Sequence, residues 1–410
     1  MRIALVHQPW NAFLPPVEVG SIAIWNDRVA HCLVRRAHHE VLALGSTRET
    51  RATRREIDGI ECHAIPLGLG PRIERLRERF GLDRDPRTPR LLSPGAYGGF
   101  QRRLVERLAA LRPDVVHLQN LAQLAPPVRA RLPRCRLILH MHCEWLSQLD
   151  PTWMARLIAP VDAIVCCSEA VAAGVRRAHP AHAGRTHVVP NGVDTAAFRP
   201  TPETHGVVRT LLFVGRISPE KGLHLLIPAF ARLASQRPDL RLRIVGPDAT
   251  TSRAILVDLS DDSRVRALAR FYEQDYLAHL RALTAPLGAR VEFAGGVPQR
   301  DLPGEYARAT VVVQPSLYES FGMPVIEAMA CGRAVVAARA GGLAELIEDG
   351  RDGLLAAPDD VDSLAAALAR ALDDDRLRAG LASAGPGKVA SHFDWERVTD
   401  AVLRVYAPDP

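Results

Sequence analysis

The sequence predicts an α/β protein with two Rossmann-like domains. Its 410 residues exceed one ordinary hydrophobic core and suit two domains of roughly 200 residues each. Short apolar, β-branched runs alternate with helical patterns in both halves, which is typical of parallel sheets covered by helices. Several of these runs end in polar residues, and polar groups at the carboxyl ends of parallel strands line ligand sites in such folds.

The composition favours a globular protein over a membrane protein. Hydrophobic residues make up 47% of the chain and charged residues 24%, as in soluble domains. No apolar run reaches the ~18 residues that a membrane span needs. The N-terminal residues MRIALVHQPW turn polar too soon for a signal peptide and are typical of a first buried strand. We therefore expect a cytoplasmic protein without an integral membrane span.

Net charge and cysteine spacing narrow the possible ligands. The formal net charge of +6 favours an anionic ligand, such as a nucleoside diphosphate, or a membrane surface. Because Lys and Arg do not gather in one block, we expect no nucleic-acid partner. The seven cysteines form no C-x-x-C pair, so neither a zinc site nor a disulfide framework is predicted. We expect no metal site.

The N-terminal part of the chain follows a strand–loop–helix–strand pattern. Strands are expected at residues 3–6 and 41–44, with a helix at about residues 21–36 between them. Gly20, just before this helix, can let the backbone serve a phosphate group. Residues 72–90 are dense in Arg, with Asp and Glu between. We favour a solvated helix and loop there over a mobile segment covering the acceptor side.

The α/β pattern returns after Pro113. Strands are expected at residues 114–120, 137–142 and 163–168. In parallel sheets the carboxyl ends of the strands line the ligand crevice. That rule nominates five polar residues as ligand candidates: His117, Asn120, His140, His142 and Ser168.

The second half opens with an apolar strand at residues 210–214 and a loop that carries two cations. Arg216 and Lys221 lie in the loop at residues 215–222, which leads into a helix. A guanidinium can fork onto a phosphate, and an ammonium supplies a compact charge. Because surface cations are usually only solvated, these residues alone leave phosphate binding and simple solvation both open.

The stretch at residues 311–348 carries the strongest chemical signal. A buried strand at residues 311–313 gives way to a polar loop, and Pro324 suits the first turn of the following helix. Glu319 in the loop and Glu327 in the helix can point into one cleft. In the alternative without a ligand site, Glu319 is solvated and Glu327 only favours a helix N-terminus. The residues alone leave both interpretations open.

The block at residues 318–355 resembles a known family over tens of positions. It reads YESFGMPVIEAMACGRAVVAARAGGLAELIEDGRDGLL, and its Glu319-to-Glu327 spacing resembles the E-x7-E motif of retaining GT-B glycosyltransferases of the GT4 family. The resemblance implies a GT-B fold, with two Rossmann-like domains facing a central cleft. It further implies that Glu319 lies beside the donor sugar and that Glu327 binds the ribose hydroxyls. It also implies that the backbone amides of Phe321, Gly322 and Met323 hold the hexose.

Two further stretches resemble sequence motifs of the same family. The loop with Arg216 and Lys221 resembles the pyrophosphate site, where both cations would neutralise the leaving nucleoside diphosphate. The strand end at residues 140–142 resembles a His position near the donor sugar and the acceptor. The register places His142 there, with His140 as the alternative.

Two weaker matches concern the phosphates and the base of the donor. Gly20-Ser21 stands where the family usually has a Gly-Gly pair whose backbone approaches the donor phosphates. Residues 290–297 resemble a strand whose following loop holds the base, which makes Val297 a candidate through its backbone.

The resemblance also identifies residues 248–270 as an insertion of unassigned role. Asp258, Asp261 and Asp262 lie within it. These carboxylates could bind a metal, but we favour a solvated loop.

Domain boundaries follow from the resemblance as well. The stretch at residues 191–194 resembles the segment that precedes the interdomain linker. We expect an acceptor-binding domain at 1–197, a linker at 198–207, a nucleotide-sugar-binding domain at 208–387 and a C-terminal helix at 388–410 that returns to the first domain.

The resemblance predicts a retaining glycosyltransferase. It would move a hexose-type sugar from a UDP- or GDP-type donor to the hydroxyl of a small-molecule, glycan or lipid-linked acceptor. Positive side chains would replace the divalent metal, so no cofactor is expected. No residue stands out as a nucleophile, which favours a front-face mechanism based on positioning and electrostatic stabilisation.

Two alternatives remain open from the sequence. One is a nucleotide-sugar 2-epimerase, a family that lacks this E-x7-E block. The other is a non-catalytic nucleotide-sugar-binding module. Donor hydrolysis in the absence of an acceptor would distinguish an enzyme from such a module.

Overall fold

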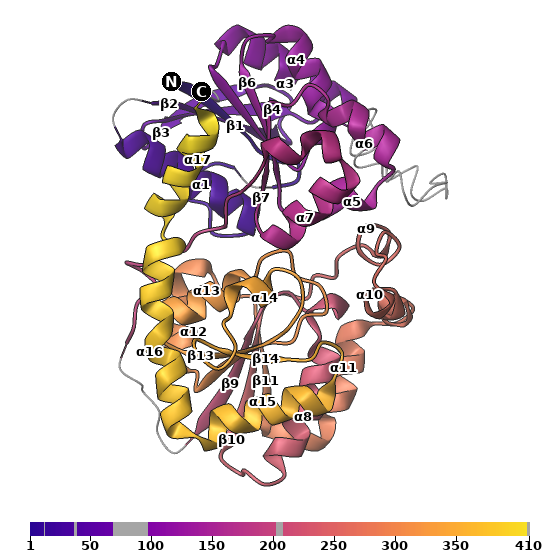
Figure 1. The fold of residues 1–410 in the computed structure, drawn as a ribbon, viewed down its shortest axis with the longest axis vertical. Coiled ribbons are helices and arrows are strands. Elements are labelled where there is room, and N and C mark those ends of the chain that lie inside the picture. The colour runs from indigo at the N-terminus through magenta and orange to yellow at the C-terminus, as the bar shows by residue number, and fades with distance from the viewer. Residues whose placement is uncertain (12, 37–38, 69–96, 202–207, 408–410) are drawn as a thin grey trace. The chain divides into compact units, whose positions relative to one another are not determined.

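The chain forms two compact units, each built on its own sheet. The computed structural model describes residues 1–11, 13–36, 39–68, 97–201 and 208–407 (Figure 1). The first unit combines Met1–Asn191 with Trp395–Pro410, and the second unit is Gly192–Asp394.

The first unit contains a sheet in the strand order β3-β4-β2-β1-β5-β6-β7-β8. Neighbouring strands are parallel, except that β3 and β4 form an antiparallel hairpin at one edge. Its strands are β1 (Arg2–Val6), β2 (Glu40–Thr47), β3 (Thr53–Ile57), β4 (Ile60–Pro66), β5 (Val115–Gln119), β6 (Arg136–Met141), β7 (Ala163–Cys166) and β8 (Thr186–Val188). Its helices are α1 (Ser21–Arg35), α3 (Gly98–Leu111), α4 (Ala125–Arg131), α5 (Trp145–Gln148), α6 (Pro151–Ile158), α7 (Glu169–Ala178) and α17 (Trp395–Tyr406).

The last helix of the chain belongs to the first unit. In α17, Trp395, Val398 and Val402 recur at helical spacing and are buried in the same core as α1 (Figure 1). On the polar side of the helix, Arg36 pairs with Asp400 at 2.7 Å. Because exposed ion pairs contribute little, apolar burial rather than this ion pair holds the segment here.

Tyr406 ties α17 to the centre of the first sheet. Its hydroxyl lies 2.7 Å from Nδ1 of His117 on β5, and both residues are buried. Burial lowers the pKa of His117 to about 3, so the imidazole is neutral at physiological pH. The Tyr406 hydroxyl is the hydrogen-bond partner of the His117 ring, because Nε2 of His117 has no partner among the described residues.

The second unit contains a parallel sheet in the order β11-β10-β9-β12-β13-β14. The strands are β9 (Arg209–Val214), β10 (Leu240–Val245), β11 (Val291–Gly295), β12 (Val311–Gln314), β13 (Ala334–Ala338) and β14 (Leu354–Ala356). The helices are α8 (Leu223–Ala234), α9 (Arg253–Leu256), α10 (Ser263–Ala267), α11 (Tyr276–Thr284), α12 (Leu302–Arg308), α13 (Met323–Ala330), α14 (Leu343–Leu346), α15 (Val361–Asp373) and α16 (Asp375–His392).

Both faces of the second sheet are covered, as its apolar strands require. Leu211 and Val311 belong to a core cluster shared with α8 and α15. Leu212 and Val312, one position out of phase with them, are also fully buried. Because successive strand residues point to opposite faces, burial of both sets explains why these strands are continuous apolar runs.

Three features differ from the expectation. The sequence pattern did not reveal the β3–β4 hairpin. Residues 192–197 and 388–394 lie in the second unit rather than with the first domain and the returning helix. α16 extends to His392 and α17 begins only at Trp395, and the Val193 N–H donates to the Phe393 carbonyl oxygen at 2.8 Å. Residues 72–90 and most of the expected 198–207 linker lie outside the described residues.

We predict that Tyr406→Phe destabilises the first unit. The substitution leaves the buried Nδ1 of His117 without a partner, which costs about 1–3 kcal/mol. Urea unfolding should show this loss. The double variant Tyr406→Phe/His117→Phe, which removes both polar partners, should lose less than the two single losses added together. Unfolding of Tyr406→Phe at the wild-type midpoint would contradict the prediction.

Candidate active site

Backbone packing holds the loop between β12 and α13 in place. Gly322 precedes α13 at φ +116°, and a Cβ there would lie 2.5 Å from the Leu343 side chain. The Gly342 N–H donates to the Glu319 carbonyl oxygen at 2.9 Å. A Cβ on Gly341 would lie 2.2 Å from that same oxygen. The amide of Gly342 therefore supports the loop that carries Glu319.

The start of α13 presents free backbone donors. Phe321, Gly322 and Met323 donate no backbone hydrogen bond to another described residue. The helix begins at Met323, one residue before Pro324, and Pro324 adds no donor of its own. Unpaired N–H groups at a helix N-terminus attract an anion or a hydroxyl oxygen. The three amides are therefore available for the hexose contact expected of them.

Glu319 and Lys221 form an ion pair at the carboxyl ends of two neighbouring strands. Lys221 Nζ lies 2.7 Å from Glu319 Oε2, with 13% and 14% of the two side chains exposed. Ser316 Oγ donates to the same carboxylate oxygen at 3.4 Å. An ammonium has three donors, so Lys221 keeps two for a further acceptor. β9 and β12 pair directly, and their ends bring these residues together although they are far apart in sequence.

A buried carboxylate holds Arg216. Its Nη2 donates to Glu220 Oε1 at 3.1 Å, and its Nη1 donates to Thr251 Oγ1 at 2.5 Å. The Glu220 side chain is 2% exposed and also accepts from Ser218 Oγ, whereas 45% of the Arg216 side chain is exposed. Two acceptors thus hold the Arg216 guanidinium in place, and its other N–H donors remain for a ligand. The sequence analysis did not identify Glu220 or Thr251.

Glu327 lies on α13 and has different partners from Glu319. Its Oε2 accepts from the Tyr306 hydroxyl at 2.7 Å, and its Oε1 lies 3.5 Å from Gln299 Nε2. The residue is 4% exposed. Burial raises the pKa of the Glu327 carboxyl to about 7, and the hydrogen bond from Tyr306 limits the rise. The weaker contact leaves Oε1 as the oxygen with capacity for a ligand.

The loop after β11 contains the candidate base contact. Val297 lies two residues before Gln299, whose amide approaches Glu327. The loop is therefore on the side of the sheet that carries α13. Tyr306 and Gln299 gave no signal in the sequence, because neither a buried tyrosine nor a loop glutamine belongs to a recognisable motif.

In the first unit, Gly20 precedes α1 at φ +87° and is exposed. Its carbonyl accepts the first helical hydrogen bond, from Ile24, at 2.9 Å. The N-terminus of α1 has no side-chain cap. Backbone donors at this end of the helix are therefore not used by a capping side chain, as a phosphate contact would require.

His142 follows β6 and is held by two amide side chains. Its Nε2 lies 2.7 Å from Gln119 Oε1, and its backbone N–H donates to Asn120 Oδ1 at 2.7 Å. The His142 ring stacks on His140 with centroids 3.9 Å apart. His140 is fully buried and His142 is half-buried. Of the two candidates for this position, only His142 can therefore meet a ligand.

The histidines of this cluster are neutral. Burial lowers the pKa of His142 to about 3 and lowers that of His140 well below its ordinary value. Neighbouring imidazoles lower the pKa of His140 further. A neutral ring can donate and accept hydrogen bonds but supplies no positive charge.

Two other polar residues nominated by the parallel-sheet rule have structural roles. Ser168 caps α7 by accepting from the Val171 N–H at 3.3 Å. Asn120, at φ +58°, orients the backbone of His142. The rule nominated polar residues at the carboxyl ends of these strands, but it could not separate accessible groups from internal supports.

The acidic residues of the 248–270 segment form local ion pairs. Asp258 pairs with Arg253 at 3.0 Å, and Asp262 pairs with Arg264 at 2.6 Å and caps α10. Within the described residues, no group of three or more His, Cys, Asp or Glu residues could hold a metal ion.

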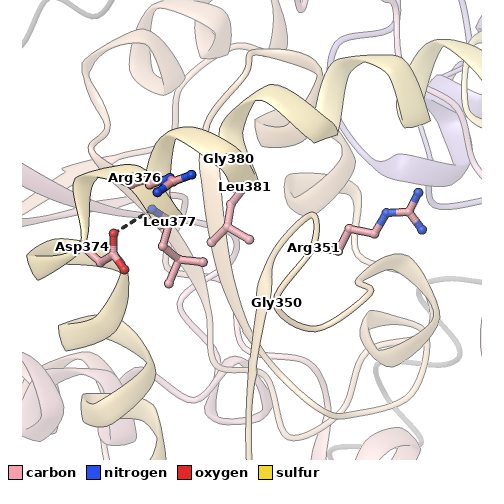
Figure 2. Close-up of a pocket in the computed structure, with 7 residues that line it drawn as sticks. All are labelled: Gly350, Arg351, Asp374, Arg376, Leu377, Gly380 and Leu381. Atoms are coloured by element: carbon pink, nitrogen blue, oxygen red, sulfur yellow. Dashed lines mark hydrogen bonds between the residues drawn. The ribbon is translucent and has the colours of Figure 1, made fainter.

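A separate hollow of about 510 Å³ lies between the start of α16 and the turn before β14 (Figure 2). It contains none of the residues described above. Asp374 caps α16 there by accepting from the Leu377 N–H at 2.8 Å. The residues that line this hollow are Gly350, Arg351, Asp374, Arg376, Leu377, Gly380 and Leu381.

Family comparisons match both halves of the chain. The family model described as "Glycosyltransferase Family 4" matches residues 24–197, and "Glycosyl transferases group 1" matches residues 196–388. A glycogen synthase from Mycobacterium tuberculosis is 30% identical over 314 residues, which are 72% of this chain and 69% of that relative. The chain belongs to glycosyltransferase family 4. The resemblance found in the E-x7-E block is thereby confirmed.

Other curated relatives match over shorter shares. A D-inositol 3-phosphate glycosyltransferase from Acidothermus cellulolyticus is 36% identical over 62% of this chain and 54% of its own length. A phosphatidyl-myo-inositol mannosyltransferase from Mycolicibacterium smegmatis is 35% identical over 53% of this chain and 50% of its own length. The chain thus spans about half the length of these curated relatives.

Solved structures confirm the expected GT-B fold. A sucrose-phosphate synthase from Thermosynechococcus elongatus has a TM-score of 0.72 at 24% identity, covering 99% of this chain and 98% of that one. HepE from Anabaena, in complex with UDP and glucose, has a TM-score of 0.70 at 22% identity, with 98% of both chains covered. In the part of this family member that the structure describes, no helix is both long and apolar enough to cross a membrane.

We predict a pH-dependent stability from Glu327. The folded pKa of about 7 exceeds the unfolded value of 4.5, so the folded chain binds more protons between these pH values. The contribution of Glu327 to the free energy of unfolding should therefore be highest below about pH 4.5. It should fall by about 3 kcal/mol as the pH rises from 4.5 through 7. Glu327→Gln should remove this fall.

Urea unfolding from pH 4.5 to 8 measures the effect. The exposed Glu273 offers a control, because Glu273→Gln should leave the pH dependence of the wild type unchanged. A stability difference between wild type and Glu327→Gln that is constant with pH would contradict the raised pKa.

Proposed function

We propose that the protein is a retaining glycosyltransferase that moves a hexose-type sugar from a UDP- or GDP-type donor to an acceptor hydroxyl. The observation that carries the proposal is the Lys221–Glu319 pair beside the free amides of α13, at the carboxyl ends of β9 and β12. Family membership supports it, as do relatives whose names describe glycosyl transfer. The solved HepE complexes hold UDP, UDP-glucose, or UDP with glucose.

The donor would occupy the second unit in a defined order of contacts. Arg216 and the two spare donors of Lys221 would bind the diphosphate. Oε1 of Glu327 would accept from the ribose hydroxyls, and the backbone near Val297 would contact the base. Glu319 and the amides at residues 321–323 would bind the hexose. Each proposed contact uses donor or acceptor capacity that the internal hydrogen bonds leave over.

The chemical step would depend on charge at the leaving group. As the bond between the anomeric carbon and the phosphate oxygen breaks, the diphosphate takes the electron pair, and Arg216 and Lys221 stabilise the added negative charge. The acceptor oxygen forms its new bond on the same face, and its proton passes to the departing phosphate oxygen. Glu319 would stabilise the positive charge that develops on the sugar.

His142 and Gly20 are the proposed ligand contacts of the first unit. As a neutral imidazole, His142 would exchange hydrogen bonds with a sugar or acceptor hydroxyl without repelling a cationic transition state. Gly20 would let the backbone approach a phosphate. The acceptor is proposed as a small-molecule, glycan or lipid-linked hydroxyl compound.

Turnover should survive chelation of metal ions, because Arg216 and Lys221 would neutralise the diphosphate in place of a metal. Purified protein is incubated with UDP- and GDP-hexoses in EDTA, and release of the nucleoside diphosphate is measured with and without candidate acceptors. A matched reaction receives manganese or magnesium. Turnover that is lost in EDTA and restored by metal would contradict the role of Arg216 and Lys221. Binding of a donor without any release or transfer would favour a non-catalytic binding module.

The two carboxylates should fail in different ways. Glu327→Ala removes a charge-assisted contact to the ribose, worth roughly 1.5–3 kcal/mol, so affinity for free nucleoside diphosphate should fall at least tenfold. Glu319→Ala frees Lys221 for the diphosphate, so nucleotide affinity should hold while kcat falls. Calorimetry with UDP and GDP on both variants measures the contrast. Loss of nucleotide binding in Glu319→Ala but not in Glu327→Ala would reverse the two assignments.

A further inference from the structure

The segment at residues 248–270 begins against the loop that carries Arg216. Gly246, at the end of β10, approaches Gly215 so closely that a Cβ on Gly246 would lie 1.8 Å from the Gly215 carbonyl oxygen. A backbone bridge then joins Ile217 to Asp248. The first residues of the segment are therefore tied to the Arg216 loop before the chain turns into α9 and α10.

Thr251 forms hydrogen bonds with Arg216, with Glu220 and with Ser218. Its Oγ1 accepts from Arg216 Nη1 at 2.5 Å and donates to Glu220 Oε1 at 3.2 Å. Its backbone N–H donates to Ser218 Oγ at 3.2 Å. Arg216 Nη2 reaches the same Glu220 oxygen at 3.1 Å. The hydroxyl thus closes a ring of three hydrogen bonds between a guanidinium and a buried carboxylate.

We propose that Thr251 is a positioning residue, contributed by the 248–270 segment, that holds the Arg216 guanidinium in its phosphate-binding orientation. This inference rests on the proposed function of Arg216. It gives part of the inserted segment a role in donor binding, and it does not require Thr251 to touch the donor.

The need for such a support follows from the exposure of Arg216. Nearly half of its side chain, 45%, is exposed, and a single contact to Glu220 would let the guanidinium rotate about that bond. With Nη1 and Nη2 each fixed by one acceptor, the plane of the group is defined. Three of the five N–H donors of a guanidinium then remain for a phosphate. A preoriented guanidinium loses less conformational freedom when a ligand binds, so binding costs less free energy.

Thr251→Val separates this role from loop anchoring. Valine replaces the hydroxyl by a methyl group, whereas the backbone N–H that donates to Ser218 is present in every variant. Thr251→Ser keeps the hydroxyl and should behave as wild type. The adjacent Thr250 is exposed, so Thr250→Val is a matched control for the change in polarity.

Calorimetry compares UDP and GDP with uridine and guanosine. We expect Thr251→Val to weaken nucleoside diphosphate binding by about tenfold and to leave nucleoside binding unchanged. Arg216→Ala should give a larger loss of the same kind. Adding Thr251→Val to Arg216→Ala should cause no further loss, because the hydroxyl would act only through the guanidinium. Thermal midpoints of all variants identify any loss that comes from unfolding.

The outcomes separate this inference from the proposed function. Wild-type diphosphate affinity in Thr251→Val, with a loss in Arg216→Ala, would overturn the positioning role and leave the phosphate role of Arg216 intact. Wild-type affinity in Arg216→Ala would overturn the phosphate role itself. Equal losses from Thr251→Val in the presence and absence of Arg216, or equal losses for nucleosides and diphosphates, would also overturn the positioning role.

Discussion

The close approach of two loops at the carboxyl ends of β9 and β12 is the constraint on which the candidate site of the second unit depends. A Cβ on Gly222, which lies at φ +74°, would meet the Pro315 carbonyl oxygen at 2.1 Å, so only glycine lets the loops touch there. Because of that contact, Lys221 lies within 2.7 Å of Glu319. The proposed leaving-group charge and sugar contacts are thereby placed together on a backbone that cannot easily separate them.

Buried carboxylates are the second organising feature. Glu220 and Glu327 are almost fully buried, and an ionised carboxylate in such a place needs donors. Glu220 receives a guanidinium and two hydroxyls, whereas Glu327 receives one short phenol contact and one long amide contact. This difference explains why Glu220 serves as an internal support. Burial raises the pKa of Glu327, and its long amide contact leaves Oε1 with capacity for the proposed ribose contact.

The first unit uses neutral groups where the second uses charges. His140 and His142 stack at 3.9 Å, and burial keeps both uncharged. Tyr406 from the last helix contacts His117, whose ring centroid lies 5.3 Å from that of His140. The last helix therefore helps to hold the histidine cluster in place. The half-buried neutral ring of His142 suits recognition of a hydroxyl group, whereas the cations of the second unit suit a diphosphate.

The sequence by itself determined the α/β class, the family and the elements around the E-x7-E block, because these depend on patterns between near neighbours. Apolar runs identify buried parallel strands, and Glu319 and Lys221 lie in the loops that follow β12 and β9. Only the tertiary structure decided which groups meet: Lys221 and Glu319 are 98 residues apart, and Thr251 reaches Arg216 from a segment with no motif of its own. The sequence did not reveal Tyr306 for the same reason, since its hydroxyl on α12 meets Glu327 on α13 across 21 positions of the chain rather than within a local pattern.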